Sequence, residues 1–331
     1  MPTGIPVQQL TYIYPQGSVS SVNKFDRKGL GSMGSQGLLR LSAGQLELLL
    51  APTAGGAIAR FDWIEEERRV PVLRGCDGVP KNVLEAGNFP LVPFVNRVRG
   101  GIFTFRGREI VLTPTLPGDP SPLHGQGWLA PWAIESVGAA EAELCFRHPP
   151  GEWPWAYEAR QLFQLDSQGL SLALTCRNVT DEPMPCGLGQ HPYFTCTGET
   201  RLATEVTHAW TIDEHVLPVE KVPATGRYDL RDRLVCSQDL DHGFGGWGGS
   251  ASMKTPGTPF VIRLSSPQAR FFQLYSPKQG GLYVAEPVTH ANAAMNAPEA
   301  EWSTLGLRVL QPGEVMRLDM RLDLTAVNLR Q

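Results

Sequence analysis

Apolar and polar side chains alternate over long stretches of this chain. Residues 314–324 read EVMRLDMRLDL, in which five apolar residues from Met316 to Leu324 alternate with Arg and Asp. Side chains two positions apart share one face of a strand, so this pattern predicts a half-buried strand. The same period at residues 157–165 and 170–176, on either side of the turn sequence DSQG, predicts a β-hairpin.

Shorter apolar runs predict further strands elsewhere in the chain. They cover residues 37–50, 57–63, 102–105, 109–112, 143–147, 203–210, 260–264, 271–275 and 281–285. The sequence has 35 Gly and 28 Pro, which punctuate these strands, and it contains no long run with the 3.6-residue period of a helix. We therefore predict an all-β chain with enough strands for two large packed sheets.

The first 36 residues differ from the rest. They mix Gly, Ser and polar residues without a sustained period, and they include the segment GLGSMGSQ at 29–36. Residues 1–36 are therefore predicted to be an irregular N-terminal tail. Residues 37–331 contain no linker sequence, so we expect them to form a single domain, although a length of 331 residues also allows two.

Composition narrows the range of partners. The chain has 42% hydrophobic and 19% charged residues and a net charge of -4, which is typical of a globular protein without a concentrated basic surface. Nucleic acid and anionic membrane are therefore not expected as partners. We expect a neutral small molecule as the partner instead. The chain has no apolar run of about 18 residues and no signal peptide pattern, so we expect a cytoplasmic protein, either monomer or homodimer.

Cysteine and histidine spacing does not favour a metal site. The six cysteines form no C-x-x-C pair and most lie in apolar runs, which favours buried free thiols over disulfides or metal ligands. The seven histidines are scattered. No metal is therefore expected.

Two segments in the first half of the chain contain candidate binding or catalytic residues. In NFPLVPFVNRVRGG, two prolines stiffen the chain before Asn96 and Arg97, which could donate to hydroxyl oxygens. The alternative is a surface salt bridge for Arg97 and a turn cap for Asn96. In PLHGQGW, His124 lies beside glycines that allow a ligand close to the backbone, and Trp128 and Trp132 could pack against a sugar. The alternative is a loop histidine bonded to the backbone.

Two further segments carry a possible acid and base. In GLGQHPYF, Pro192 favours an extended backbone at His191, and Tyr193 and Phe194 could fix its ring; a structural histidine is the alternative. In GGLYVAEPVTH, an apolar strand is predicted to end at Glu286, where a carboxylate is costly unless it is bonded or functional. A structural Glu that accepts from backbone N–H groups is the alternative.

Asp241 is a weaker candidate. It lies in the predicted loop QDLDHGF, where Asp239 and His242 are equally well placed. The glycine cluster at 245–249 that follows has no strand before it or helix after it, so we interpret it as a flexible loop rather than a phosphate site.

Taken together, these segments resemble the galactose mutarotase (aldose 1-epimerase) family, in the family's order along the chain. The matching pieces are FVNRVRGG with the following FTFRGR, then LHG, HPYF, AEPVT and the closing LQPGE. The resemblance spans roughly residues 37–324 and implies a large antiparallel β-supersandwich, in agreement with the period-two pattern.

The resemblance also implies roles for the candidate residues. Glu286 would be the general base and His191 the general acid, with His124, Arg97 and Asn96 as binding partners and Asp241 as a further sugar contact. The chain departs from the family pattern at Gln126, where a second glycine is common, and at Thr195, where Asn is common. Both departures are expected to touch the substrate pocket and so to bear on which sugar is bound.

The sequence therefore predicts an aldose 1-epimerase that opens and closes a pyranose ring by acid and base catalysis, without a cofactor. Three alternatives stay open. An enzyme for hexose 6-phosphates would need extra cations, for which Arg97, Arg99, Arg106 and Arg108 are available. A glycoside hydrolase would need a second carboxylate near Glu286, such as Asp241. A non-catalytic sugar-binding protein could use the same scaffold.

Overall fold

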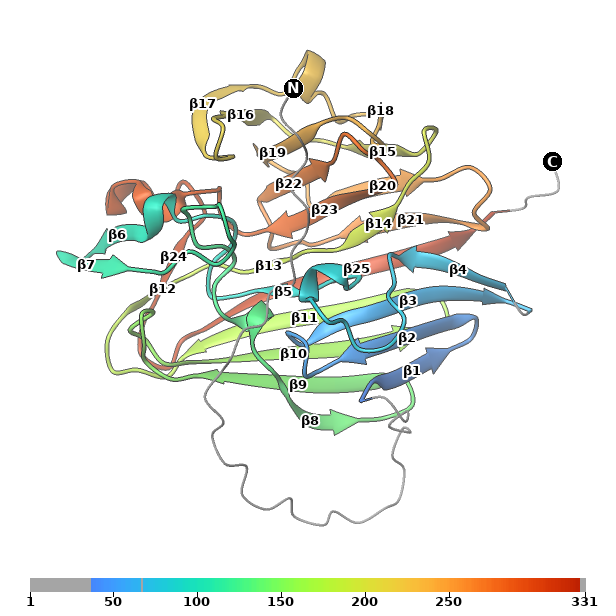
Figure 1. The fold of residues 1–331 in the computed structure, drawn as a ribbon, viewed down its shortest axis with the longest axis horizontal. Helices are drawn as coiled ribbons and strands as arrows, with labels where there is room; N and C mark the ends of the chain where they lie inside the picture. Colours follow the sequence, from blue (N-terminus) through green and yellow to red (C-terminus); the bar gives the residue numbers. More distant parts are fainter. Residues whose placement is uncertain (1–36, 67, 328–331) are drawn as a thin grey trace, which may run out of the picture.

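The computed structural model describes residues 37–66 and 68–327, so the predicted tail at 1–36 lies outside the described residues. These residues form two large antiparallel sheets, a third of four strands and two small pairs. Figure 1 shows the nine-stranded sheet from β8 (Ala133–Val137) at the bottom of the view to β18 (Arg233–Leu234) at the top. The eight-stranded sheet lies beside its upper half and the four-stranded sheet, in blue, beside its lower half (Figure 1). The predicted all-β supersandwich is confirmed.

The nine-stranded sheet contains the longest strands of the described residues. Its order is β18 (Arg233–Leu234), β15 (Arg201–Thr204), β20 (Ser250–Lys254), β21 (Phe260–Ser265), β25 (Val315–Ala326), β11 (Gly169–Asn178), β10 (Tyr157–Asp166), β9 (Glu141–His148) and β8 (Ala133–Val137). The predicted hairpin is β10–β11, closed by the pair Asp166 and Gly169, and the predicted C-terminal strand is β25. The five alternating apolar residues of β25, from Met316 to Leu324, are buried, as the alternation indicates.

The eight-stranded sheet bears the candidate site. Its order is β17 (Pro218–Pro223), β16 (His208–Ile212), β19 (Leu240–Gly245), β22 (Phe271–Ser276), β23 (Leu282–Val288), β13 (Gly189–Gln190) and β5 (Pro90–Leu91), and β14 (Tyr193–Thr195) also pairs with β23.

The remaining elements are smaller. The four-stranded sheet joins β1 (Leu39–Ala43), β2 (Leu46–Ala51), β3 (Ala57–Glu65) and β4 (Arg68–Leu73), and the two-stranded pairs are β6 (Ile102–Phe105) with β7 (Arg108–Val111) and β12 (Met184–Cys186) with β24 (Arg308–Leu310). Short 3-10 turns connect them: η1 (Val83–Glu85), η2 (Arg99–Gly101), η3 (Gly127–Leu129), η4 (Gly226–Tyr228), η5 (Ala294–Asn296) and η6 (Glu299–Glu301). Within the described ranges, none of these turns has the length or apolar character of a membrane span.

Two predicted strands are each divided in the structure. Residues 37–50 form β1 and β2, because Gly44 adopts φ 57° and reverses the chain there. Residues 203–210 form the end of β15 and the start of β16, which belong to different large sheets. Short apolar runs cannot reveal such a crossing, since both halves keep the period of two.

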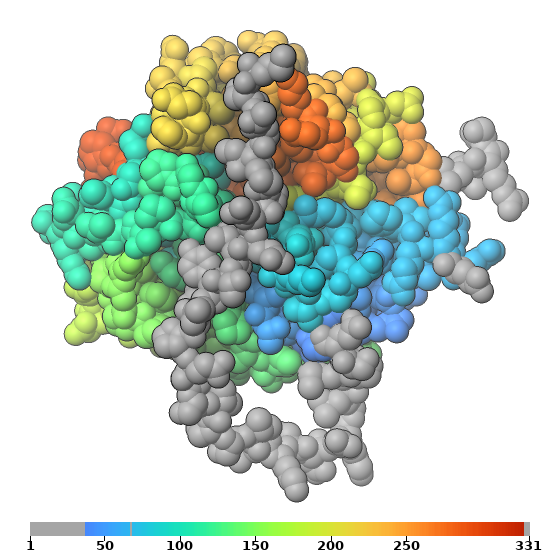
Figure 2. Space-filling view, in the orientation of Figure 1, coloured from blue at the N-terminus to red at the C-terminus, as the bar shows by residue number. Residues whose placement is uncertain are grey.

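One hydrophobic cluster connects the three larger sheets. It includes Leu48 of the four-stranded sheet, Leu174 and Leu318 of the nine-stranded sheet, and Leu274 and Phe244 of the eight-stranded sheet. In Figure 2 the segments coloured blue to cyan and those coloured yellow to orange occupy different regions of the visible face. The division into a tail and one domain stays a prediction.

We expect replacement of Leu174 by Ala to destabilise the protein by about 2–5 kcal/mol, because the side chain is fully buried between neighbouring strands and truncation leaves a cavity. Urea denaturation measures the change. Val219→Ala, at a side chain that is 67% exposed, is the control and should cost less than about 1 kcal/mol. Equal losses for the two variants would contradict the assignment of this core.

Candidate functional site

The register around β23 places His191 directly across from Glu286. On one flank of β23, Gly189 pairs with Val288 and Tyr193 pairs with Val284. Residue 191 lies two positions inward from each of these pairs, and the same register therefore puts it opposite residue 286. The ladder is interrupted between β13 and β14, at His191 and Pro192. The His191 Nε2 atom lies 3.6 Å from Glu286 Oε1.

Further polar side chains lie next to Glu286 on two more strands of the same sheet. On the other flank of β23, Glu286 pairs with Gln273 of β22, and Gln273 in turn pairs with Gly243 of β19. The Gln273 amide Nε2 donates to Asp241 Oδ1 at 2.7 Å. Asp241 lies two residues before Gly243 and so shares its face of the sheet. The side chains of His191, Glu286, Gln273 and Asp241 therefore form one continuous polar row.

The structure corrects two predictions about strand ends. Glu286 is not the end of its strand, since β23 continues through Pro287 to Val288. Pro287 is tolerated because it lies beside the gap between β13 and β14, where no ladder partner is required. Asp241 is on strand β19 rather than in a loop. Polar and glycine residues have low strand propensity, and pairing with β22 overrides it here.

Aromatic rings hold the His191 side chain. Phe89 stacks on the imidazole with ring centroids 4.5 Å apart and 15° between planes, and Tyr193 lies 4.7 Å away. Tyr193 therefore acts as predicted. Phe194 does not: it points to the opposite face and stacks on Tyr283 in the core, because successive strand residues alternate.

Side chains from the segment after β23 fix the Asn96 and Arg97 backbone. His290 Nε2 accepts from Val95 N–H at 3.1 Å, while Asn292 Oδ1 accepts from Arg97 N–H at 3.0 Å. These bonds link residues about 195 positions apart in the sequence. The segment that carries Asn96 and Arg97 is thus tied to the strand that carries Glu286.

His124 is locked against Asn96 by two hydrogen bonds. The Asn96 N–H donates to His124 Nδ1 at 3.1 Å, and the His124 N–H donates to the Asn96 carbonyl at 3.0 Å. Because Nδ1 accepts, a neutral His124 carries its proton on Nε2. The His124 and His191 rings meet edge to face, with their centroids 5.4 Å apart, which places His124 beside His191 and Glu286.

Arg97 is held by a carboxylate from another loop. Its guanidinium Nε donates to Asp119 Oδ2 at 2.9 Å, and both side chains are mostly buried. The surface salt bridge considered for Arg97 is thus an ion pair at the site. Asp241, not Asp239, reaches the row: Asp239 lies in the exposed turn before β19.

Burial favours the uncharged forms of Glu286 and His191. It raises the pKa of Glu286 well above its ordinary value, with a further rise from the Asp241 charge and a smaller opposing effect of Arg97. Burial lowers the pKa of His191 to about 3. Both shifts favour a proton on Glu286 and a neutral His191 in the free protein.

Burial and nearby charges also shift the pKa values of Asp241 and His124. Burial raises the pKa of Asp241, while Arg97 and the Gln273 hydrogen bond lower it. Burial lowers the pKa of His124 well below 6.5, and His191 and Arg97 lower it further. His124 is therefore a neutral donor at physiological pH.

Three atoms of the row are buried without a hydrogen-bond partner among the described residues. They are His191 Nδ1, Glu286 Oε2 and Gln273 Oε1. Unpaired buried polar groups are costly, and at a site they are available to a polyhydroxylated ligand. In the described part of the chain, no group of three or more His, Cys, Asp or Glu is arranged to hold a metal ion.

The tryptophans and Gln126 do not lie as predicted. Trp128 and Trp132 are buried, and their indole N–H groups donate to carbonyls of residues 123–127, so they brace the His124 loop and provide no open wall. Gln126 accepts from the Tyr157 hydroxyl at 3.1 Å. Thr195 lies at the exposed end of β14.

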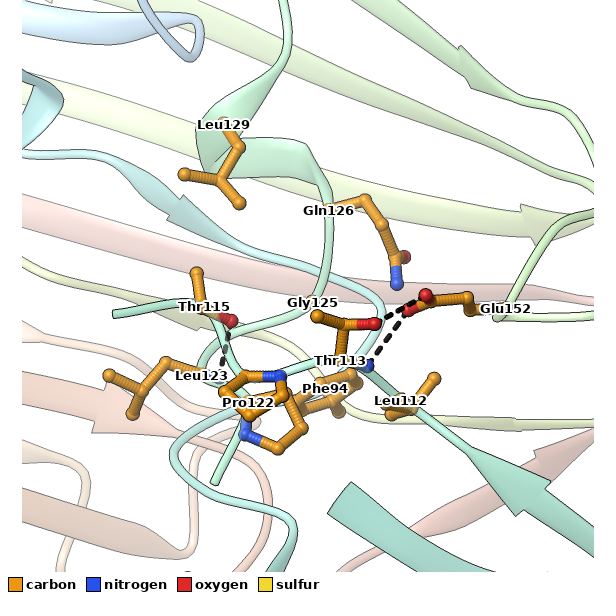
Figure 3. Close-up of a pocket in the computed structure, with 11 residues that line it drawn as sticks. Phe94, Leu112, Thr113, Thr115, Pro122, Leu123, Gly125, Gln126, Leu129 and Glu152 are labelled. Carbon is orange, nitrogen blue, oxygen red and sulfur yellow. Dashed lines mark hydrogen bonds between the residues drawn. The ribbon is translucent and has the colours of Figure 1, made fainter. Parts of the chain in front are cut away.

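Gln126 also lines a cavity of about 510 Å³ that is distinct from the row. Figure 3 shows Thr113 bonded to Glu152 on one wall and Leu129 on another. Its lining contains none of His191, Glu286 and Asp241. The departure at Gln126 therefore affects this neighbouring cavity.

The structure thus brings together all six predicted residues, Glu286, His191, Asp241, Arg97, His124 and Asn96. The sequence analysis missed Gln273, Phe89 and Asp119. Gln273 had a detectable signal, because it is the one polar residue within the apolar run FFQLY at 271–275. Phe89 and Asp119 had none, since only the folded chain brings them to His191 and Arg97.

Comparison with known proteins agrees with this geometry. The family model described as aldose 1-epimerase matches residues 37–323. YphB of Escherichia coli K12, an uncharacterized protein, is 31% identical over 294 residues, which cover 85% of this chain and 97% of YphB.

Solved structures also match. A candidate aldose 1-epimerase from Escherichia coli K12 has a TM-score of 0.79 at 30% identity and covers 88% of this chain and 99% of its own. The GalM/aldose epimerase homologue from C. elegans has a TM-score of 0.75 at 15% identity, with 88% and 99% covered, which supports the fold alone. The family match over residues 37–323 and the 31% identity to YphB show that the chain belongs to the aldose 1-epimerase family.

Proposed function

We propose that the protein interconverts the α and β anomers of a free aldohexose, with Glu286 and His191 as the catalytic pair. The observation that carries this proposal is their approach to 3.6 Å in a buried row that also contains Asp241. Anomer exchange needs one group that takes a proton and one that gives a proton, both within reach of the same pyranose.

The reaction moves two protons and breaks one bond. Glu286 takes the proton from the anomeric O1 hydroxyl while His191 gives a proton to the ring O5, and the C1–O5 bond breaks. The resulting aldehyde rotates about C1–C2 and closes on its other face. On closure the two proton transfers reverse, so the enzyme returns to its starting state.

The pKa shifts of the free pair fit this cycle. Burial favours a proton on Glu286, and transfer of that proton from Glu286 to His191 would produce the base and acid that the reaction uses. Sugar hydroxyls that bond to the row would favour this charged arrangement, because hydrogen bonds to a charged form stabilise it. Arg97 and the neutral His124 would then stabilise charge that develops on the sugar oxygens.

Contacts of the other arginines disfavour a hexose 6-phosphate as substrate. Arg99 bonds to the Pro218 carbonyl and lies near Asp213, and Arg108 lies near Glu182 at the surface. Arg106 lies over the Phe105 ring and is exposed. Only Arg97 affects the pKa of Glu286 and Asp241, and it already pairs with Asp119.

We expect the wild-type protein to accelerate anomer exchange of α-glucose or α-galactose, and Glu286→Gln or His191→Asn to lower kcat by about 10²- to 10⁴-fold, since each removes a proton-transfer group. Polarimetry or proton NMR measures the rate. Val219→Ala serves as a folded control with unchanged rate.

Two results would contradict the proposal. A wild type that never exceeds the spontaneous rate with any common aldose but binds one would favour a sugar-binding protein. Release of a free sugar from a glycoside, lost in Glu286→Gln and Asp241→Asn, would favour a hydrolase.

The lowered His191 pKa and the raised Glu286 pKa predict an unusual pH profile. Over the range where the pair keeps one proton, kcat/KM is expected to stay level, from neutral pH down to about pH 5. It should fall only as a second proton binds near the His191 pKa of about 3, and on the alkaline side as Glu286 loses its proton. Initial rates across buffers measure this; an acid midpoint near 6.5 would show that His191 is charged in the free enzyme.

A further inference from the structure

We propose that Asp119 is a positioning residue of this site: it fixes the Arg97 guanidinium beside Glu286 and Asp241 and offsets its positive charge. The role in catalysis rests on the proposed function, whereas the orientation of Arg97 does not. The sequence analysis did not single out Asp119 as a candidate residue.

Both carboxylate oxygens of Asp119 are engaged. Oδ2 accepts from Arg97 Nε at 2.9 Å, and Oδ1 accepts from the Ser121 N–H at 2.9 Å. The backbone N–H of Asp119 also donates to the Leu116 carbonyl at 3.2 Å. The carboxylate is therefore fixed within its own loop before it meets Arg97.

The bond to Nε determines how Arg97 faces the site. A guanidinium is planar, so a partner at Nε fixes the plane of the whole group. The two terminal amino groups have no hydrogen-bond partner among residues 37–66 and 68–327. With the Arg97 backbone also held by Asn292, these terminal donors are preorganised for a ligand oxygen.

Asp119 also enters the charge balance of the row. Arg97 lowers the pKa of both Glu286 and Asp241, and Asp119 raises the pKa of Asp241. The titratable groups around Glu286 and Asp241 are His191 and Tyr193 from the β13–β14 segment, Tyr275 from β22, Arg97, Asp119 and His124 from the 115–124 loop, and Arg74, which lies over the Tyr193 ring and lowers the pKa of His191. Among these, Asp119 is the carboxylate that pairs with Arg97.

Loss of the Asp119 charge should lower the pKa values of Glu286 and Asp241. Without it, the positive charge of Arg97 acts on the carboxyl groups uncompensated, so they release their protons at lower pH. The alkaline limb of the pH profile, which follows Glu286, should therefore move to lower pH. A residue that only stabilised the loop would reduce activity without moving the profile.

The test uses the full chain with Asp119→Asn, which keeps the side-chain shape but removes the charge. We expect kcat/KM for anomer exchange to fall about 10-fold, mainly in kcat, and the alkaline limb to shift to lower pH. Asp119→Glu, which restores the charge, should return the limb toward the wild-type position. Asp232→Asn is the matched control, since Asp232 accepts from Arg201 Nε at 2.7 Å in an exposed pair, and it should change neither rate nor profile.

A second readout does not depend on activity. The ¹⁵Nε–¹Hε NMR signal of Arg97, assigned with Arg97→Lys, should be shifted and slow to exchange in the wild type and should become like that of an exposed arginine in Asp119→Asn. An unchanged signal, or a rate loss with an unmoved pH profile, overturns the proposal. If the wild type has no epimerase activity, the proposed function fails while this signal still decides whether Asp119 holds Arg97.

Discussion

The antiparallel register of β23 is the constraint on which the rest of the site depends. It places His191 and Gln273 on either side of Glu286, so that three side chains from distant parts of the sequence form one row. A shift of one residue would turn Glu286 into the opposite face, toward the core. The buried apolar neighbours of this strand resist such a shift, because Ala285 belongs to the main core cluster and Val284 and Val288 to the cluster beneath the site.

The strand opposite Glu286 is interrupted between β13 and β14. A continuous ladder with β23 would join β13 to β14 and occupy the backbone groups between them. Pro192 and Pro287 lack N–H donors at this level, so the ladder with β23 breaks there. On the other flank the β13–β5 register continues, and the His191 backbone N–H donates to the Phe89 carbonyl. This pairing brings Phe89 beside the imidazole of His191, where the two rings stack.

The sequence predicted the fold and the chemical groups better than their arrangement. Period-two patterns identified the hairpin β10–β11 and the strand β25, because these strands have one buried and one exposed face. Strand β19 was missed because its sequence, LDHGFG, is stabilised by pairing with β22 rather than by local propensity. Likewise Phe194 was expected beside His191, although alternation along β14 directs it to the core. Contacts such as Asp119 with Arg97 depend on loop geometry that no local pattern encodes.

The charge balance around Arg97 bears on the kind of ligand that the site suits. Glu286, Asp241 and Asp119 are three carboxyl groups near Arg97, which forms an ion pair with Asp119, and burial raises the pKa of Glu286. The negative charge of a phosphate placed here would add to that of the carboxylates. Neutral hydroxyl groups, in contrast, can both donate to the unpaired oxygens of Glu286 and Gln273 and accept from Arg97 and His124. This charge balance supports the proposal of an unphosphorylated sugar as the substrate.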